Sequence, residues 1–144
     1  MPEFGNNSNE MLDAVDPQLV RVMERVVAVR DITVISGFRG KEEQDRLFAE
    51  GSSKKQWPDS RHNRNKHGQL RGPAIAVDIA PWNTQQIKQI PWDDEKAFIH
   101  LAGLVDAFAA IEGVKVRWGG NWDRDEIIMD DQTFQDLGHF ELVT

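Results

Sequence analysis

The amino-acid sequence predicts a single α+β domain. Its 144 residues suffice for one hydrophobic core, and the chain contains no cysteine that would form a disulfide. Segments with the apolar spacing of a helix alternate with short segments rich in β-branched residues, without a repeat or an internal linker. We therefore expect residues 13–144 to form the domain and residues 1–12, which are mostly polar, to be a flexible N-terminal lead.

Three helices are predicted, over residues 17–30, 41–51 and 94–112. The first has Asp16 as its N-cap and Pro17 in its first turn, where a backbone N–H is not needed. The last is capped by Asp93 or Asp94, carries a stripe of apolar residues on one face and ends at Gly113. Helices of this kind pack their apolar face on a core.

Four strands are predicted, over residues 32–36, 74–80, 114–118 and 139–143. Each is short and rich in β-branched or aromatic residues, which are favoured in strands. Residues 52–73 are rich in Ser, Lys, Asn, Gly and Pro and show no periodicity, so they are expected to form a loop. A loop of this length inside a compact domain usually carries function.

The overall charge excludes several classes of partner. The net charge is −7 and the pI is near 5.0, whereas a protein that binds nucleic acid needs a basic face to neutralise phosphates. The N-terminal residues lack the apolar stretch of a secretory signal, and no segment approaches the length of a membrane span. We expect a protein that is made in the cytoplasm, binds no nucleic acid and does not insert into a membrane.

Two distant segments carry the residues expected to perform chemistry. Asp78 lies within the apolar segment AIAVDIA, where a carboxylate is costly unless it is paired. In the segment HFELV, the two-residue period of a strand places His139 and Glu141 on the face opposite the apolar side chains. Asp136 precedes His139 by three residues across a Leu-Gly pair predicted to form a turn. Without cysteine, any metal site must consist of histidine and carboxylate side chains.

Each of these residues also has a simpler interpretation. Asp78 would equally suit a structural ion pair with an arginine. Glu141 would either orient a metal-binding histidine or lie in solvent at the surface of the strand. Trp118 and Trp122 flank a Gly-Gly-Asn turn and would form either an aromatic wall for substrate or part of the core.

Five short motifs occur in one order along the chain: SGFR (36–39), SRH (60–62), AVDIAPW (76–82), WGGNW (118–122) and DLGHFEL (136–142). Together they resemble the zinc D-Ala-D-Ala carboxypeptidase and L-alanyl-D-glutamate endopeptidase family, and in particular its small single-domain phage endolysins. The resemblance covers roughly residues 30–143. It implies the Hedgehog/DD-peptidase-like zinc peptidase fold, in which helices pack on a small antiparallel sheet.

The resemblance also implies roles for individual residues. His62, Asp78 and His139 match the three ligands of Zn²⁺. Asp136 matches the general base of the endopeptidase members, and Arg39 matches the arginine that stabilises the oxyanion. Ser60, within the SRH motif, is similar to a serine that contacts substrate or supports the site.

Residues 63–77 contain the main departure from the family pattern. Asp78 follows His62 by sixteen residues, which is longer than the usual spacing, and His67 lies between them as an alternative first ligand. Six basic residues of the long loop also border the predicted site: Lys54, Lys55, Arg61, Arg64, Lys66 and Arg71. They would attract an anionic peptide or simply be solvated. The acidic segment 123–131 would bind a second cation or form a solvated loop.

The resemblance implies a zinc metallopeptidase that hydrolyses peptidoglycan stem peptides at the L-Ala–D-Glu bond. Such a phage endolysin would be synthesised in the host cytoplasm and would act, as a monomer, on the cell wall in the periplasm at lysis. Two alternatives fit the same sequence. One is a D-Ala-D-Ala carboxypeptidase on the same fold, and the other is a zinc-stabilised module that binds the cell wall without catalysis.

Overall fold

The computed structural model describes residues 2–82, 89–122, 124 and 136–144. It confirms an α+β fold, whose elements in chain order are α1 (Asn6–Leu12), α2 (Pro17–Val29), β1 (Ile32–Ser36), α3 (Lys41–Ala49), the short 3₁₀ helix η1 (Arg61–Asn63), β2 (Ala76–Pro81), α4 (Glu95–Glu112), β3 (Val116–Gly119) and β4 (Asp136–Leu142). No helix in this described part of the chain is both long and apolar enough to span a membrane.

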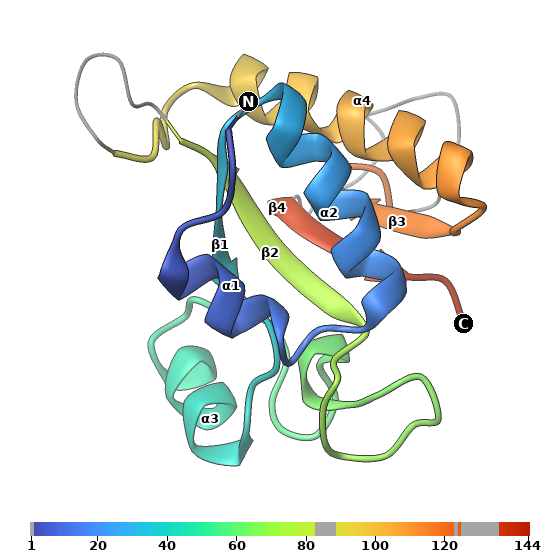
Figure 1. Ribbon diagram of the computed structural model, residues 1–144. Helices are drawn as coiled ribbons and strands as arrows, with labels where there is room; N and C mark the ends of the chain where they lie inside the picture. The colour runs from blue at the N-terminus through green and yellow to red at the C-terminus, as the bar shows by residue number, and fades with distance from the viewer. Residues whose placement is uncertain (1, 83–88, 123, 125–135) are drawn as a thin grey trace.

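The four strands form one antiparallel sheet in the order β1-β2-β4-β3. Helices α2 and α4 pack on each other and cover one face of this sheet (Figure 1). The core lies between these two layers, and alternate residues of the central strands enter it, including Val77 and Ile79 of β2 and Phe140 of β4. All three are fully buried, so the sheet is fixed by an apolar layer on this face.

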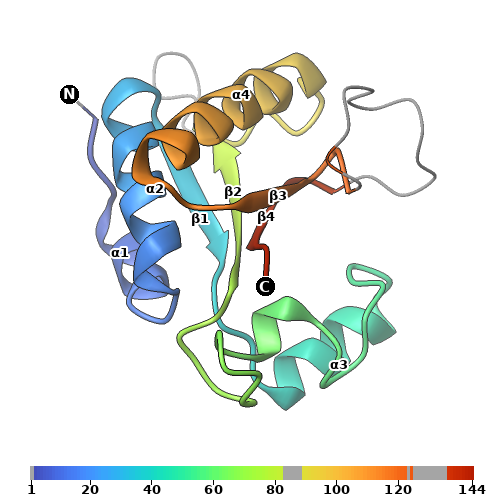
Figure 2. The same cartoon turned by 90° about the vertical axis from the view of Figure 1, so that its right-hand side faces the viewer.

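The other face of the central strands carries polar side chains. The strand register aligns Ser36 of β1 with Asp78 of β2, and Asp78 with His139 of β4. Because side chains alternate along a strand, these three residues lie on the face opposite Val77, Ile79 and Phe140. Helix α3, η1 and the long loop lie together at one end of the sheet (Figure 2). Residues of the long loop therefore lie next to Ser36, Asp78 and His139.

The predicted starts of α2 and α4 and the predicted end of α4 are confirmed, whereas α3 ends at Ala49, two residues before the predicted end at Gly51. The Asp16 carboxylate accepts a hydrogen bond of 2.9 Å from the Gln18 N–H at the start of α2. Asp94, rather than Asp93, caps α4, since its carboxylate accepts from the Ala97 N–H at 3.1 Å. Gly113 ends α4 in the left-handed region with φ of 71°, which glycine adopts without a steric cost.

The prediction of a flexible lead over residues 1–12 is wrong for most of that segment. Residues 6–12 form α1, which packs on β1 (Figure 1). The Ser8 hydroxyl accepts a hydrogen bond of 3.0 Å from the Val34 N–H, and Leu12 is buried in the core. Strand β1 lies at the edge of the sheet, so α1 satisfies a backbone group there that would otherwise need water. The sequence did not predict this helix, because its residues are mostly polar and only two of them are buried.

The last strand begins earlier than predicted. Leu137 and Gly138 belong to β4, which starts at Asp136, and they do not form a turn. The strand passes close to β2 at this point, because a Cβ atom at Gly138 would lie 2.5 Å from the Ile79 carbonyl oxygen. Asp136 is therefore held by the sheet itself and pairs with Gly119 of β3.

Candidate metal centre

Three side chains from distant parts of the chain converge on the polar face of the sheet. His62 Nε2 lies 3.1 Å from Asp78 Oδ1 and 3.3 Å from His139 Nδ1, and His139 Nδ1 lies 2.9 Å from Asp78 Oδ1. Donor atoms bound to one zinc ion at about 2.0–2.1 Å with tetrahedral angles lie roughly 3.3 Å from one another. Two nitrogens and one carboxylate oxygen in this triangle fit a metal with an open fourth position.

The outer nitrogen of each histidine has a hydrogen-bond acceptor. His62 Nδ1 lies 2.7 Å from the Gly37 carbonyl oxygen, and His139 Nε2 lies 2.8 Å from Glu141 Oε1. In the neutral imidazoles, each outer nitrogen donates its proton to that acceptor, so the inner nitrogen is the one that can offer a lone pair to a metal. The sequence-based ligand set His62, Asp78 and His139 is therefore brought together by the fold. His67 is exposed and lies outside the group.

A short capped turn holds His62. Ser60 is the N-cap of η1, where its hydroxyl accepts from the His62 N–H at 3.2 Å. The Asn63 side chain accepts in return from the Ser60 N–H at 3.1 Å, which completes a reciprocal cap. Ser60 lines the cleft described below, but its hydroxyl supports the turn that presents the histidine.

Arg39 fixes the second oxygen of Asp78. Its Nη2 lies 2.7 Å from Asp78 Oδ2, while its Nε donates to the Ser36 hydroxyl at 2.8 Å. Both side chains of this pair are largely shielded from water, with 12% and 13% of their surfaces exposed. Although burial raises the pKa of Asp78, His62 and His139 oppose it and hold that pKa below its usual range. The carboxylate is therefore ionised and oriented for a cation.

The role that the sequence left open for Glu141 is settled by its contacts. Glu141 is 4% exposed, accepts from His139, and pairs with Arg117 at 2.7 Å and with Arg61 at 3.1 Å. Although burial raises the pKa of Glu141, hydrogen bonds from His139 and Arg117 lower it to about 2. It is not a solvated residue. The cross-strand register of Arg117 with Glu141 is the signal that places this pair, and the register is not visible in the sequence.

Asp78 and Glu141 also determine the direction in which the pKa of His139 is shifted. Burial lowers the pKa of His139, but hydrogen bonds to Asp78 and Glu141 outweigh burial and raise it to about 9. Without a metal, the imidazole therefore holds a second proton on the nitrogen that faces the other two ligands. A bound divalent ion replaces this proton, because the same nitrogen cannot hold both.

Asp136 lines the same cleft as this group and interacts electrostatically with it. Burial and the charge of Asp78 raise the pKa of Asp136, while His139 and His62 lower it. Strand β3 passes so close that a Cβ atom at Gly119 would clash with the Asp136 backbone. The glycine of the WGGNW motif thus allows β4 to carry Asp136 beside the ligands.

The three candidate metal ligands line a cleft with a volume of about 850 Å³. Its described walls also include Arg39, Ser60, Asp136 and Trp122, as the sequence predicted. The Trp122 ring lies 5.5 Å from the His139 ring. Trp92, which stacks on Phe98 at 6.1 Å, was not singled out from the sequence, since no motif marks it.

Trp118 does not reach this cleft. It is 5% exposed and belongs to the core, and its indole N–H donates to the Leu137 carbonyl at 2.8 Å. The expectation of a substrate contact at Trp118 is corrected, because side-chain alternation in β3 turns it toward α4 rather than toward the ligands. The predicted cation site in the acidic segment 123–131 lies outside the described residues, apart from Arg124.

Comparisons with known proteins agree with this arrangement. Residues 2–143 match the family described as phage L-alanyl-D-glutamate peptidase. An L-alanyl-D-glutamate peptidase of Escherichia phage T5 is 30% identical over 145 residues, covering 98% of both chains. The crystal structure of the Serratia marcescens L-Ala D-Glu endopeptidase ChiX superposes with a TM-score of 0.72 at 26% identity, covering 99% of this chain and 91% of that one.

Proposed function

The chain belongs to the phage L-alanyl-D-glutamate peptidase family, and we propose that it is a zinc-dependent endopeptidase that cleaves the L-Ala–D-Glu bond of peptidoglycan stem peptides. The observation that carries this proposal is the triangle of His62 Nε2, Asp78 Oδ1 and His139 Nδ1, whose sides of 2.9–3.3 Å suit one tetrahedral ion. Histidine and carboxylate ligands with an open position are typical of catalytic zinc sites.

Zinc held by these three residues would polarise the scissile carbonyl and lower the pKa of a coordinated water toward about 7. The remaining chemistry belongs to residues of the chain. Asp136, as general base, takes a proton from the attacking water and delivers it to the leaving amine of the D-glutamyl residue. Its raised pKa suits both steps, because a carboxyl group must first accept this proton and then release it.

Arg39 has two tasks in this proposal. Its contact with Asp78 Oδ2 holds that ligand in place. Its hydrogen bonds to Ser36, Gln44 and Asp78 occupy three of the five N–H groups of the guanidinium. The remaining N–H groups stabilise the oxyanion that forms on the scissile carbonyl, as predicted from the SGFR motif.

The test is mass spectrometry of purified peptidoglycan digested with and without a chelator, together with the metal content of the same sample. New L-Ala carboxyl and D-Glu amino termini that disappear on chelation, with about one zinc ion per chain, are the expected result. Release of terminal D-Ala alone would identify a carboxypeptidase. Bound zinc without cleavage of any stem bond would identify a binding module and overturn the proposal.

The same proposal covers the setting of the reaction. We propose that the enzyme acts as a monomer on the cell wall at lysis, through the cleft described above. Size-exclusion chromatography with light scattering tests the monomer. Lysis assays on permeabilised cells, compared with intact cells, test whether the enzyme must cross the membrane to reach its substrate.

A further inference from the structure

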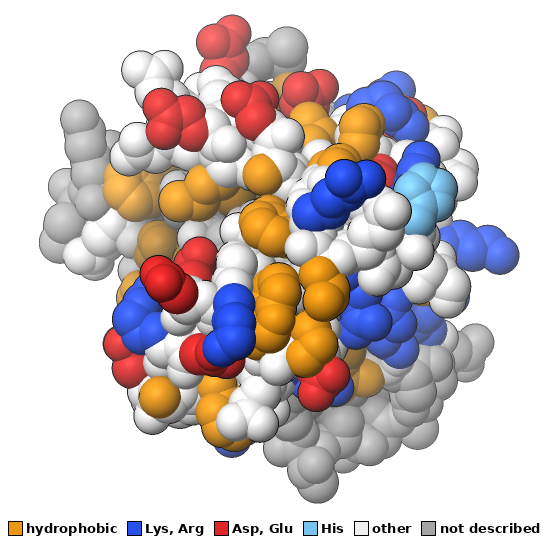
Figure 3. All heavy atoms as spheres, turned by 90° about the horizontal axis from the view of Figure 1, so that it is seen from below, with side chains coloured by type: hydrophobic (Ala, Val, Ile, Leu, Met, Phe, Trp, Pro, Cys, Tyr) orange, Lys and Arg blue, Asp and Glu red, His pale blue; other side chains and the backbone are white. Residues whose placement is uncertain are grey.

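The cleft is basic although the chain is acidic. Its described walls contain six Lys or Arg residues and four Asp or Glu residues, while the whole chain has a net charge of −7. Figure 3 shows Lys and Arg side chains gathered on the face formed by α3 and the long loop. An excess of cations confined to one cleft favours an anionic ligand there.

Most of these cations already have a partner in the protein. Arg39 pairs with Asp78, and Arg61 and Arg117 both pair with Glu141. Lys55 differs from them. It is exposed at the cleft, and no carboxylate of the described residues lies within ion-pair distance of its ammonium group.

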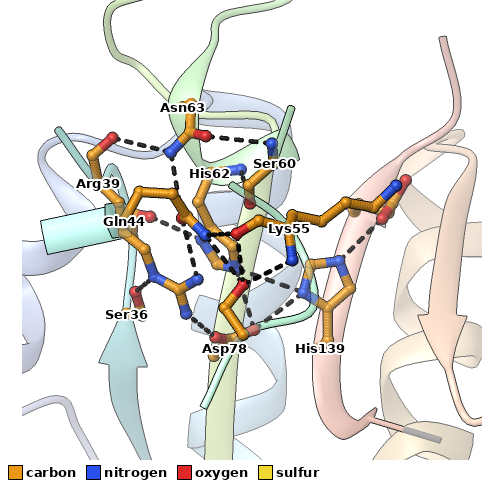
Figure 4. Close-up of polar contacts among 12 residues, drawn as sticks. Ser36, Arg39, Gln44, Lys55, Ser60, His62, Asn63, Asp78 and His139 are labelled. Atoms are coloured by element: carbon orange, nitrogen blue, oxygen red, sulfur yellow. Dashed lines mark hydrogen bonds and ion pairs between the residues drawn. The ribbon is translucent and has the colours of Figure 1, made fainter. Parts of the chain in front are cut away.

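The backbone of Lys55 is tied to the metal ligands through one buried amide. Gln44 is fully buried, and its Nε2 donates to the Lys55 carbonyl oxygen at 2.7 Å. Its Oε1 accepts from Asn63 Nδ2 at 3.2 Å and from Arg39 Nη1 at 3.4 Å. Asn63 completes the turn that holds His62, and Arg39 holds Asp78. Gln44 thus fixes the position of Lys55 relative to the two ligands on this side of the site (Figure 4).

The Lys55 side chain leaves this anchored backbone and extends in the direction of the strand that carries His139 (Figure 4). Arg64, another cation of the cleft, also forms no ion pair with a carboxylate of the described residues. Its Nη2 donates to the Asp59 carbonyl oxygen at 2.9 Å, and its Nε is buried without an acceptor. Lys54 also lines the cleft but has an interaction of its own. Lys55 therefore presents an exposed charge that pairs with no carboxylate of the described residues, on a backbone that Gln44 holds.

The substrate of the proposed reaction offers a matching anion. A D-glutamyl residue has two carboxyl groups, and a peptide bond to the next residue uses only one of them. The other stays ionised at neutral pH, a few bonds from the scissile nitrogen. We infer that the ammonium group of Lys55 binds this free carboxylate on the leaving-group side of the cleft, and that Gln44 sets its distance from the reacting bond. This inference rests on the proposed endopeptidase function.

The test uses two synthetic peptides that differ only at the D-glutamyl side group, which is a carboxylate in one and a carboxamide in the other. The wild-type enzyme is expected to prefer the carboxylate peptide by about ten- to a hundredfold in kcat/KM, the scale of a hydrogen bond between charged groups. Lys55→Gln should reduce this preference to within about threefold, mainly by slowing cleavage of the carboxylate peptide. Lys55→Arg should retain most of it.

Lys66→Gln is the matched control, because Lys66 is an exposed lysine of the same loop outside the cleft walls. It should leave the preference unchanged. A full preference in Lys55→Gln, or its loss in Arg64→Gln alone, would overturn the assignment. If wild type cleaves neither peptide, the proposed function fails; calorimetric binding of both peptides to wild type and Lys55→Gln then decides separately whether Lys55 recognises the carboxylate.

Discussion

The two faces of the central strands are stabilised in different ways. On one face, Val77 and Phe140 are fully buried, and they stabilise the fold because their apolar surface is removed from water. On the other face, their neighbours Asp78 and His139 are also shielded, but each needs a polar partner for every group that it buries. Adjacent residues of β2 or β4 therefore stabilise the fold differently, one by apolar burial and the next by hydrogen bonds and ion pairs.

The comparison shows why a cation suits the polar face. Asp78 and Glu141 supply two negative charges, and Arg39, Arg61 and Arg117 supply positive charges around them. These ion pairs neutralise the carboxylates on the side that faces away from the candidate metal position. The inside of the site consists of two imidazole nitrogens and one carboxylate oxygen at 2.9–3.3 Å, an arrangement that only a proton or a metal ion completes. The apolar face needs no such ligand.

The largest expected effect separates chemistry from structure on the polar face. Asp136→Asn should reduce kcat by about 10²–10⁴-fold, the range typical of a general base, because the amide cannot accept the proton. Zinc content should stay near one per chain, since Asp136 is not among the three ligands. Kinetics on a stem peptide and metal analysis of the same sample measure both quantities. Activity within tenfold of wild type would refute the assigned role.

The apolar face should respond in the opposite way. Phe140→Ala removes a fully buried ring and should lower the free energy of unfolding by about 3–5 kcal/mol. Residual folded protein should still bind zinc, because the altered side chain lies on the other side of the strand from His139. Urea denaturation with and without zinc provides the measurement. A loss of zinc affinity larger than the loss of stability would show that the two faces are not independent.

The same two faces explain how much the sequence predicts. Apolar spacing and two capping aspartates predicted α2, α4 and most of the sheet, because burial of an apolar stripe is encoded locally. Alternation in HFELV also predicted the shared face of His139 and Glu141. Helix α1 was missed because it contributes little apolar surface, so its packing depends on a hydrogen bond that the Val34 N–H donates to the Ser8 hydroxyl.

The partners of the polar face depend on distances between strands, which no local pattern contains. The choice of His62 over His67, the Arg117–Glu141 pair and the buried amide of Gln44 all follow from strand register and from the path of the long loop. Trp118 and Trp122 flank the same turn, yet only Trp122 reaches the cleft. Motif order thus predicted the three residues that could hold a metal, but it did not predict which side chains line the cleft.

A pH titration of the metal-free protein sharpens the comparison. The pKa of His139 is raised from 6.5 to about 9, so the stability that its second proton contributes is complete below pH 6.5 and is lost as pH rises to 9. This loss should reach roughly 3 kcal/mol. The zinc-loaded protein should show no such loss. Urea denaturation of both forms from pH 6 to pH 9.5 is the measurement, and parallel curves would contradict the linkage.

The smallest expected effect concerns the residue behind the ligand. Glu141→Gln keeps the size of the side chain but removes the charge that orients His139 and neutralises Arg117, so zinc affinity should fall about 10–100-fold. Competition with a chelator of known affinity measures this change. The control is Leu142→Ala on the apolar side of the same strand, which should cost about 2–5 kcal/mol of stability with zinc affinity unchanged. Equal zinc affinity in Glu141→Gln and wild type would mean that the ion pairs of Glu141 hold β3 against β4 and do not set the ligand geometry.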